Sequence, residues 1–105
     1  MICANMLKRN GQRCGFHVQG HSETARSGRD IVCAAVSSAV YMAANTITEV
    51  CGCEATIHEA DGDLSVTVTQ QDAGKAKQVL DGLLIHLQGL SAQYPKAIQI
   101  QLTEV

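Results

Sequence analysis

Two tight-turn signals, each followed by a long helical stripe, constrain the fold more than any other feature of the sequence. Asn10-Gly11 lies between residues 1–9 and 13–19, and this pair readily takes the positive backbone angles of a hairpin turn. Asp61-Gly62 separates two further alternating segments within residues 55–68 in the same way. Because hairpins rather than crossovers join the strands of each pair, we expect a largely antiparallel sheet.

The helical stripes follow the two hairpins. Residues 31–50 carry small and branched apolar side chains at three- and four-residue steps, with Gly52 as the stop, and residues 72–90 carry a leucine-rich stripe. Residues 98–102 alternate as a short closing strand after Pro95. The predicted fold is α+β, with two layers: a largely antiparallel sheet of four or five strands and two helices on one face, in the order ββαββα plus a short final strand.

Length and composition limit the class of protein. The chain has 105 residues, which predicts a single domain over residues 1–105 and excludes multidomain enzymes. With 46% hydrophobic and 17% charged residues, it is too apolar for a disordered chain and too interrupted by polar residues for a membrane span. We therefore expect a soluble protein that makes no contact with a membrane.

Charge and cysteine content indicate a cytoplasmic protein without direct nucleic-acid contacts. The formal net charge is -2, and no basic cluster exceeds Lys8-Arg9, so counterion release would contribute little affinity for a nucleic acid. The N-terminal segment has its charges after a short apolar run, which is the wrong order for a secretory signal. The cysteines are odd in number, at positions 3, 14, 33, 51 and 53, so reduced thiols are the expected state.

One segment joins a histidine to a cysteine. Residues 20–29 contain two glycines and almost no apolar side chain, which predicts a mobile surface loop, with Gly20 and Gly28 as its hinges. Asp30 is well placed as the N-cap of the first helix, which makes Cys33 the third residue of the first turn. Exposed amides and the helix dipole favour a negative charge there, and the thiolate is the nucleophilic form of cysteine.

A Cys-His dyad is the most specific chemistry that this segment allows. His21 lies at the far end of the second strand, and the loop can bring it close to Cys33. An imidazole there could pair with the thiolate and later protonate the leaving amine, while the first-turn amides stabilise the oxyanion and Asp30 holds the turn. The pattern alone also allows a plainer interpretation, in which Cys33 is an inert apolar residue and His21 is solvated.

The residues of this segment also resemble those of a known protein family. Gly20-His21, Gly28 and the run Asp30-Ile31-Val32-Cys33-Ala34-Ala35-Val36-Ser37 resemble the signature of the ribosomal-processing cysteine protease family, Prp, and the resemblance extends over nearly the whole chain. It implies a homodimeric cysteine protease with His21 and Cys33 as the dyad and Asp30 as an acidic residue beside the nucleophile. The implied substrate is the precursor of the twenty-seventh protein of the large ribosomal subunit, which loses a short N-terminal extension ending in aromatic residues during ribosome assembly.

The chain departs from the family pattern around the loop. Ser22 stands where many members have alanine after the histidine, and Ser27 stands where an aromatic residue often precedes the loop glycine. Neither position is the nucleophile or the base, so the departures bear on substrate fit rather than on the chemistry. Val18 and Val36 are candidates for an aromatic-binding pocket, although each is more simply explained as a core residue.

Two other functions stay open from sequence alone. One is a noncatalytic module that binds ribosomal protein or RNA during assembly. The other is a metal-binding domain that uses Cys51 and Cys53 with His58 nearby, but the spacing leaves the remaining ligands undefined, so neither a metal nor a cofactor is expected.

Cys53 is expected to start a strand. Cys3 and Cys14 fall on paired strands, where they could approach each other or simply pack. Three histidines have no recognisable partner and are expected to be solvated: His17, His58 and His86.

Overall fold

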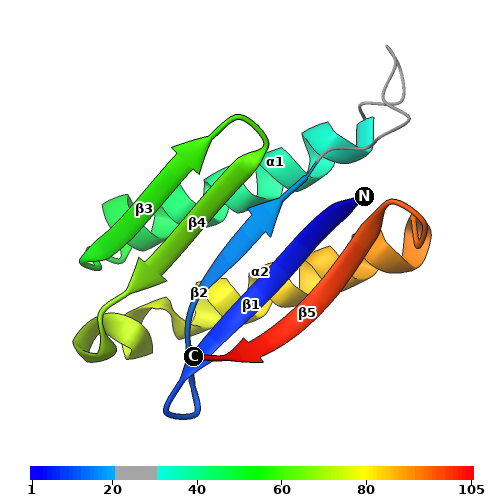
Figure 1. Cartoon of the computed structure of the whole chain (residues 1–105). Coiled ribbons are helices and arrows are strands. Elements are labelled where there is room, and N and C mark those ends of the chain that lie inside the picture. The colour runs from blue at the N-terminus through cyan, green and yellow to red at the C-terminus, as the bar shows by residue number, and fades with distance from the viewer. Residues whose placement is uncertain (21–30) are drawn as a thin grey trace.

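The computed structural model describes residues 1–20 and 31–105 (Figure 1). The elements follow in the order β1 (Ile2–Arg9), β2 (Gln12–Gln19), α1 (Ile31–Asn45), η1 (Thr46–Val50), β3 (Ala55–Ala60), β4 (Asp63–Val68), η2 (Gln70–Asp72), α2 (Ala73–Gln93) and β5 (Ile98–Glu104). The predicted mobile loop over residues 20–29, with His21 and Gly28, lies outside the described residues apart from Gly20 at its start, and so does the predicted N-cap Asp30.

The strands form one mixed sheet in the order β3-β4-β2-β1-β5. The β1–β2, β2–β4 and β3–β4 pairs are antiparallel, whereas β5 pairs with β1 in parallel. The parallel pair arises because α2 carries the chain from β4 back across the sheet before β5 begins, as a crossover connection does. The α+β prediction with a largely antiparallel sheet and a closing strand is confirmed.

Both helices cover the same face of the sheet (Figure 1). Cys14, Phe16 and Val18 of β2 are buried on this face, while Arg13 and His17 on the other face are partly exposed, as their alternation predicts. Aliphatic side chains of α1 and α2 complete one core cluster around Phe16. Since only one core residue is aromatic, the core is close-packed from small and branched side chains.

The turns and helix ends follow from particular residues. Asn10 and Gly11 both have positive φ, 53° and 77°, as a two-residue hairpin turn of this type requires. The predicted helix over residues 31–50 is continuous, but its last turn is the π-helical segment η1, and Gly52 at φ 67° follows it. By length and composition alone, residues 31–50 would also fit a membrane span. Val36, Val40 and other residues of one face are nevertheless buried in the core, as in a core helix.

Candidate active site

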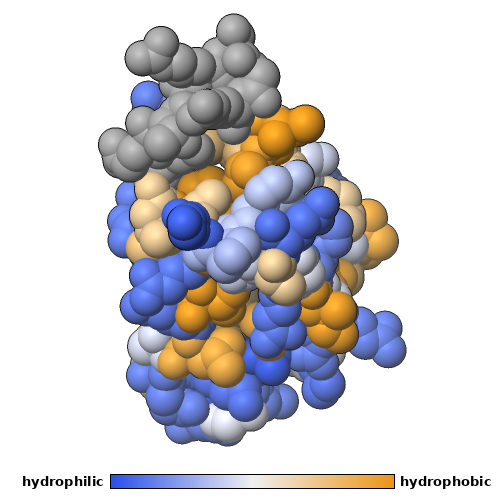
Figure 2. Space-filling view, turned by 90° about the vertical axis from the view of Figure 1, so that its right-hand side faces the viewer, coloured by the Kyte–Doolittle hydropathy of each residue, from blue (hydrophilic) through white to orange (hydrophobic). Residues whose placement is uncertain are grey.

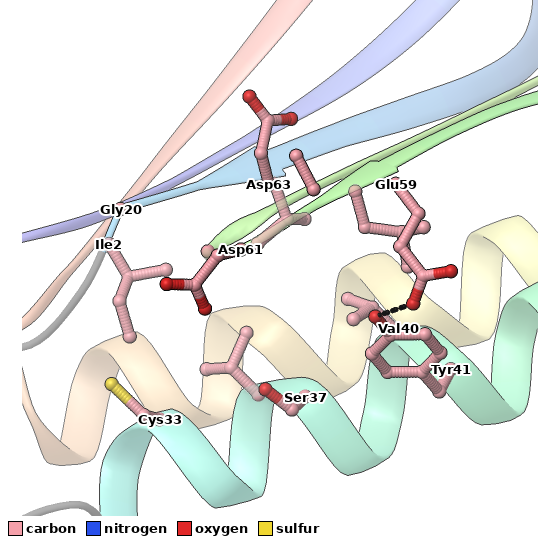
Figure 3. Close-up of a pocket in the computed structure, with 14 residues that line it drawn as sticks. Ile2, Gly20, Cys33, Ser37, Val40, Tyr41, Glu59, Asp61 and Asp63 are labelled. Atoms are coloured by element: carbon pink, nitrogen blue, oxygen red, sulfur yellow. Dashed lines mark hydrogen bonds between the residues drawn. The ribbon is translucent and has the colours of Figure 1, made fainter.

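A cavity of about 530 Å³ lies between α1 and the β3–β4 hairpin (Figure 3). Its volume is in the range of pockets that bind small molecules or peptide segments. The end of β2 and the first residues of β1 complete its wall. The lining residues are Ile2, Val18, Gly20, Cys33, Val36, Ser37, Val40, Tyr41, Glu59, Ala60, Asp61, Gly62, Asp63 and Leu64.

Cys33 is the third residue of α1, and its sulfur points into this cavity (Figure 3). Its side chain is partly buried and packs against the core. The first turn of a helix has amides without intrahelical carbonyl partners and the positive end of the helix dipole, which together favour an anion. The predicted position of Cys33 in the first turn is confirmed. The thiol therefore lies where a nucleophilic sulfur could reach a ligand in the cavity.

Gly20 forms the opposite rim of the cavity, at the end of β2. Its φ is 104°, its amide donates a hydrogen bond to the carbonyl of Gly62 at 2.9 Å, and a Cβ at this position would lie 2.3 Å from the carbonyl oxygen of Met1. The end of β2 is thus hydrogen-bonded to the β3–β4 turn and lies directly against the start of the chain, and only glycine fits there. The strand end that leads to His21 and the helix turn that carries Cys33 border the same cavity.

Three of the predicted site residues lie outside the described segments of the chain. They are His21, Gly28 and Asp30. The dyad, the N-cap of α1 and the hinge roles of Gly20 and Gly28 therefore stay predictions. The structure does describe the residues on both sides of this segment. Gly20, held by its hydrogen bond to Gly62, directly precedes His21, and Ile31, the first residue of α1, directly follows Asp30.

The two valines proposed as pocket residues have both of the roles considered for them. Val18 and Val36 are buried members of the core, and they also line the cavity. Together with Ile2, Val40 and Leu64 they form its apolar wall. A wall of this kind can contact an apolar side chain of a ligand by burying it from water.

Sequence reasoning missed the polar wall of the cavity. Glu59 and Asp61 of the β3–β4 hairpin line the side opposite α1 with their carboxylates, whereas the Asp63 carboxylate points away from α1 toward His17. Tyr41 of α1 donates a hydrogen bond from its phenol to the Glu59 carboxylate across the cavity (Figure 3). This hydrogen bond favours the protonated phenol and raises the pKa of Tyr41. The sequence did contain one indication of the α1 side of the cavity. Cys33, Ser37 and Tyr41 are four residues apart, and residues at this spacing share one face of a helix.

The prediction that His17 has no partner is wrong. Its Nε2 lies 2.8 Å from Oδ1 of Asp63, and the pair bridges β2 and β4. The residues are 46 positions apart in sequence, and only the antiparallel pairing of β2 with β4 brings them together. Local sequence patterns therefore gave no indication of this contact.

The remaining thiols do not form a second site. Cys14 and Cys53 are buried, and burial is the main cause of the raised pKa of each thiol. Cys53 does not start a strand, since β3 begins at Ala55; its thiol lies 3.7 Å from the carbonyl oxygen of Asp72. Within residues 1–20 and 31–105, no group of three or more histidine, cysteine or acidic side chains could hold a metal ion.

The pairing of the first hairpin also separates Cys3 from Cys14. Cys3 lies opposite Gln19 at one end of the hairpin, whereas Cys14 lies beside the irregular pairing after Leu7, toward the turn. All five cysteines are in described segments, and none of them forms a disulfide there. Ordinary packing in the sheet accounts for both residues.

A cysteine in the first turn of a helix, with its sulfur opening on a cavity beside an α+β sheet, is an arrangement typical of cysteine peptidases. The particular family follows from comparison with known proteins. The family described as cysteine protease Prp matches residues 1–99, and the chain belongs to this family. The family resemblance of the segment around Cys33 is thereby confirmed.

The similar proteins agree with this assignment. The chain is 25% identical over 91 residues to the ribosomal processing cysteine protease Prp of Bacillus subtilis (strain 168), covering 81% of each chain. The crystal structure of an essential ribosomal processing protease Prp from S. aureus, in complex with a covalently linked product peptide, has the same fold. Its TM-score is 0.87 at 23% identity, with 98% of this chain and 100% of that chain covered. SMU.848 from Streptococcus mutans matches with a TM-score of 0.79 at 23% identity, covering 100% and 96% of the two chains.

Proposed function

We propose that this protein is an endopeptidase in which Cys33 is the nucleophile and His21 is the general base and acid. The observation that carries the proposal is the position of Cys33, whose sulfur opens on a 530 Å³ cavity from the first turn of α1. His21 follows directly after Gly20, which borders the same cavity. A Cys-His pair in this arrangement supplies the groups that covalent peptide hydrolysis needs.

The reaction uses these groups in two stages. The Cys33 thiolate attacks the scissile carbonyl carbon, and the amides of the first turn of α1 stabilise the oxyanion that forms. The C–N bond then breaks, and the His21 imidazolium donates its proton to the leaving amine, which leaves an acyl group on the sulfur. In the second stage, His21 takes a proton from water, and the resulting hydroxide attacks the thioester. This step releases the carboxylic acid product and restores the thiolate and the imidazolium.

The proposed substrate is the precursor of the twenty-seventh protein of the large ribosomal subunit. Membership of the Prp family supports this choice, as does the similarity to the B. subtilis protein, a ribosomal processing cysteine protease. The S. aureus relative was solved with a covalently linked product peptide, which fits a peptide substrate and a covalent mechanism. The apolar wall of Val18 and Val36 is suited to the aromatic residues at the end of the extension. Processing of this substrate would take place in the cytoplasm.

The direct test is incubation of the purified protein with the unprocessed ribosomal protein, followed by mass spectrometry of the products. We expect one cut that removes the N-terminal extension, and no cut in a ribosomal protein that already lacks the extension. Binding of the precursor without cleavage would instead indicate the noncatalytic assembly module.

Selective alkylation tests the state of the thiol without any substrate. Cys14 and Cys53 are expected to react slowly near neutral pH, because burial raises the pKa of both and limits access to them. Cys3 and Cys51 are partly buried like Cys33 and are therefore the matched comparison. We expect iodoacetamide to label Cys33 at least about tenfold faster than Cys3 or Cys51, because the proposed His21 partner and the amides of a helix first turn would stabilise an anion on the sulfur. Peptide mass spectrometry over a time course measures the rates, and equal rates at the three positions would contradict an activated thiol.

We also propose that the chain forms a homodimer, as the family resemblance implies. Apolar side chains are exposed on the helical layer, among them Met42 at 64% and Ile85 at 70%, and a second subunit would cover surface of this kind. Figure 2, the view from the right-hand side of Figure 1, shows further hydrophobic patches between polar ones. Analytical ultracentrifugation is expected to give a mass near twice the 11.2 kDa of the chain. A monomer mass over the whole concentration range would contradict the proposal.

A further inference from the structure

The end of the cavity away from Cys33 is formed by two hydrogen-bonded side chains from different elements. Tyr41 lies two helical turns after Cys33 on the same face of α1, and its phenol donates to the Glu59 carboxylate of β3 (Figure 3). The hydrogen bond restrains the ring, yet Tyr41 is still 40% exposed. The pair therefore presents an aromatic surface and a carboxylate together to whatever occupies the cavity.

The charge of the cavity is negative. Glu59 and Asp61 face it with their carboxylates, whereas the Asp63 carboxylate points away to His17 on the other face of the sheet, and none of the described lining residues is lysine or arginine. The donor to Glu59 is a neutral phenol whose pKa is raised, so this hydrogen bond leaves the negative charge of the carboxylate in place. Asp61 points from the β3–β4 turn toward the end of the cavity at which Cys33 lies (Figure 3). A ligand with a positive charge beside Glu59 would thus be favoured over a neutral or acidic one.

The spacing along α1 sets which part of a peptide reaches the pair. At about 1.5 Å per helical residue, the Tyr41 position lies about 12 Å along the axis from Cys33. An extended peptide advances about 3.3 Å per residue, so the third or fourth residue from the scissile bond would lie beside the pair. A cation over the face of an aromatic ring and beside a carboxylate is stabilised by both groups.

On the basis of the proposed function, we infer that Tyr41 and Glu59 form a specificity subsite for a lysine or arginine side chain, three or four residues from the scissile bond. The guanidinium or ammonium group contacts the ring of Tyr41 and pairs with the Glu59 carboxylate. Asp61, which lies nearer Cys33, adds to the negative potential of the cavity without taking part in the contact. The subsite selects the substrate and has no part in bond cleavage.

The test is a set of matched peptides that contain the cleavage sequence of the precursor. Each of the third and fourth positions on either side of the scissile bond is lysine, norleucine or glutamate in turn, and kcat/KM is measured for each peptide. We expect one position at which lysine exceeds norleucine by at least about tenfold, and glutamate to be worst, because norleucine has the stem of lysine without its charge. The difference is expected to shrink at high ionic strength, since salt screens a partly exposed pair.

Variants then test whether Tyr41 and Glu59 cause the preference for lysine over norleucine. Glu59→Gln removes the charge and keeps a hydrogen-bond acceptor for Tyr41, and it is expected to reduce the lysine-to-norleucine ratio to about twofold or less. Tyr41→Leu is expected to reduce the ratio through loss of the ring face. Glu49→Gln is the matched control, because Glu49 is exposed on η1 and does not line the cavity; its ratio should equal that of the wild type.

The outcomes separate this inference from the proposed function. Cleavage that depends on Cys33 but proceeds equally with lysine and norleucine at every position would overturn the subsite alone. An unchanged ratio in Glu59→Gln, or the same change in Glu49→Gln, would overturn it as well. Failure of the wild type to cut any of the peptides or the full-length precursor would overturn the proposed function and the subsite with it.

Discussion

Replacement of Cys33 by alanine is expected to lower kcat/KM for removal of the extension by at least about 10⁴-fold. The methyl group of alanine cannot attack the carbonyl carbon, so no acyl intermediate forms. The side chain is only partly buried at the rim of the cavity, and the change in the free energy of unfolding should stay within about 1 kcal/mol. Single-turnover cleavage followed by mass spectrometry gives the rate, and urea denaturation gives the stability.

Cys3→Ala and Cys51→Ala are the controls for this result. Both cysteines are partly buried, and neither lines the cavity, so kcat/KM should stay within about twofold of the wild type. Cleavage by Cys33→Ala at a rate close to that of the wild type would show that the sulfur is not the nucleophile. A large loss in either control would show that the assay reports thiol loss or misfolding in general.

The sequence predicted the parts of the fold that depend on local chemistry. The Asn10-Gly11 turn, the burial alternation of β2 and the start of α1 at Ile31 all follow from a few neighbouring residues. The position of Cys33 in the first turn of a helix followed in the same way. The dyad itself rests on His21, which the described part of the chain does not include.

Pairing between distant strands is what the sequence did not reveal. The parallel β1–β5 pair depends on the path of α2 across the sheet, and the contact of His17 with Asp63 depends on β2 lying beside β4. The hydrogen bond from Tyr41 to Glu59 requires α1 to pack beneath the β3–β4 hairpin. Each contact joins segments whose separation is set by the tertiary fold, and no local propensity encodes it.

Gly20→Ala is expected to destabilise the fold by about 2–4 kcal/mol, because two separate penalties act on one residue. A φ of 104° is strained for any residue with a side chain, which costs on the order of 1–3 kcal/mol. The new Cβ would also lie 2.3 Å from the carbonyl oxygen of Met1, so the backbone at the start of β1 or at the end of β2 must move. Urea denaturation monitored by circular dichroism measures the change.

Gly82→Ala is the matched control, since Gly82 lies inside α2 and nothing is within 4 Å of a Cβ built there. Alanine at that position should stabilise the protein by about 0.5–1 kcal/mol. An unfolding free energy of Gly20→Ala within about 0.5 kcal/mol of the wild type would show that the end of β2 is not held as described.

The same substitution separates an anchoring role of Gly20 from a hinge role. An anchor predicts that stability and turnover fall together, because the substitution displaces the end of β2, which leads directly to the proposed base His21. A hinge predicts that turnover falls by a larger factor than the lost fraction of folded protein explains, because the loop then fails to move while the core stays intact. Measuring kcat well below the unfolding temperature of the variant, where nearly all molecules are folded, decides between these two roles.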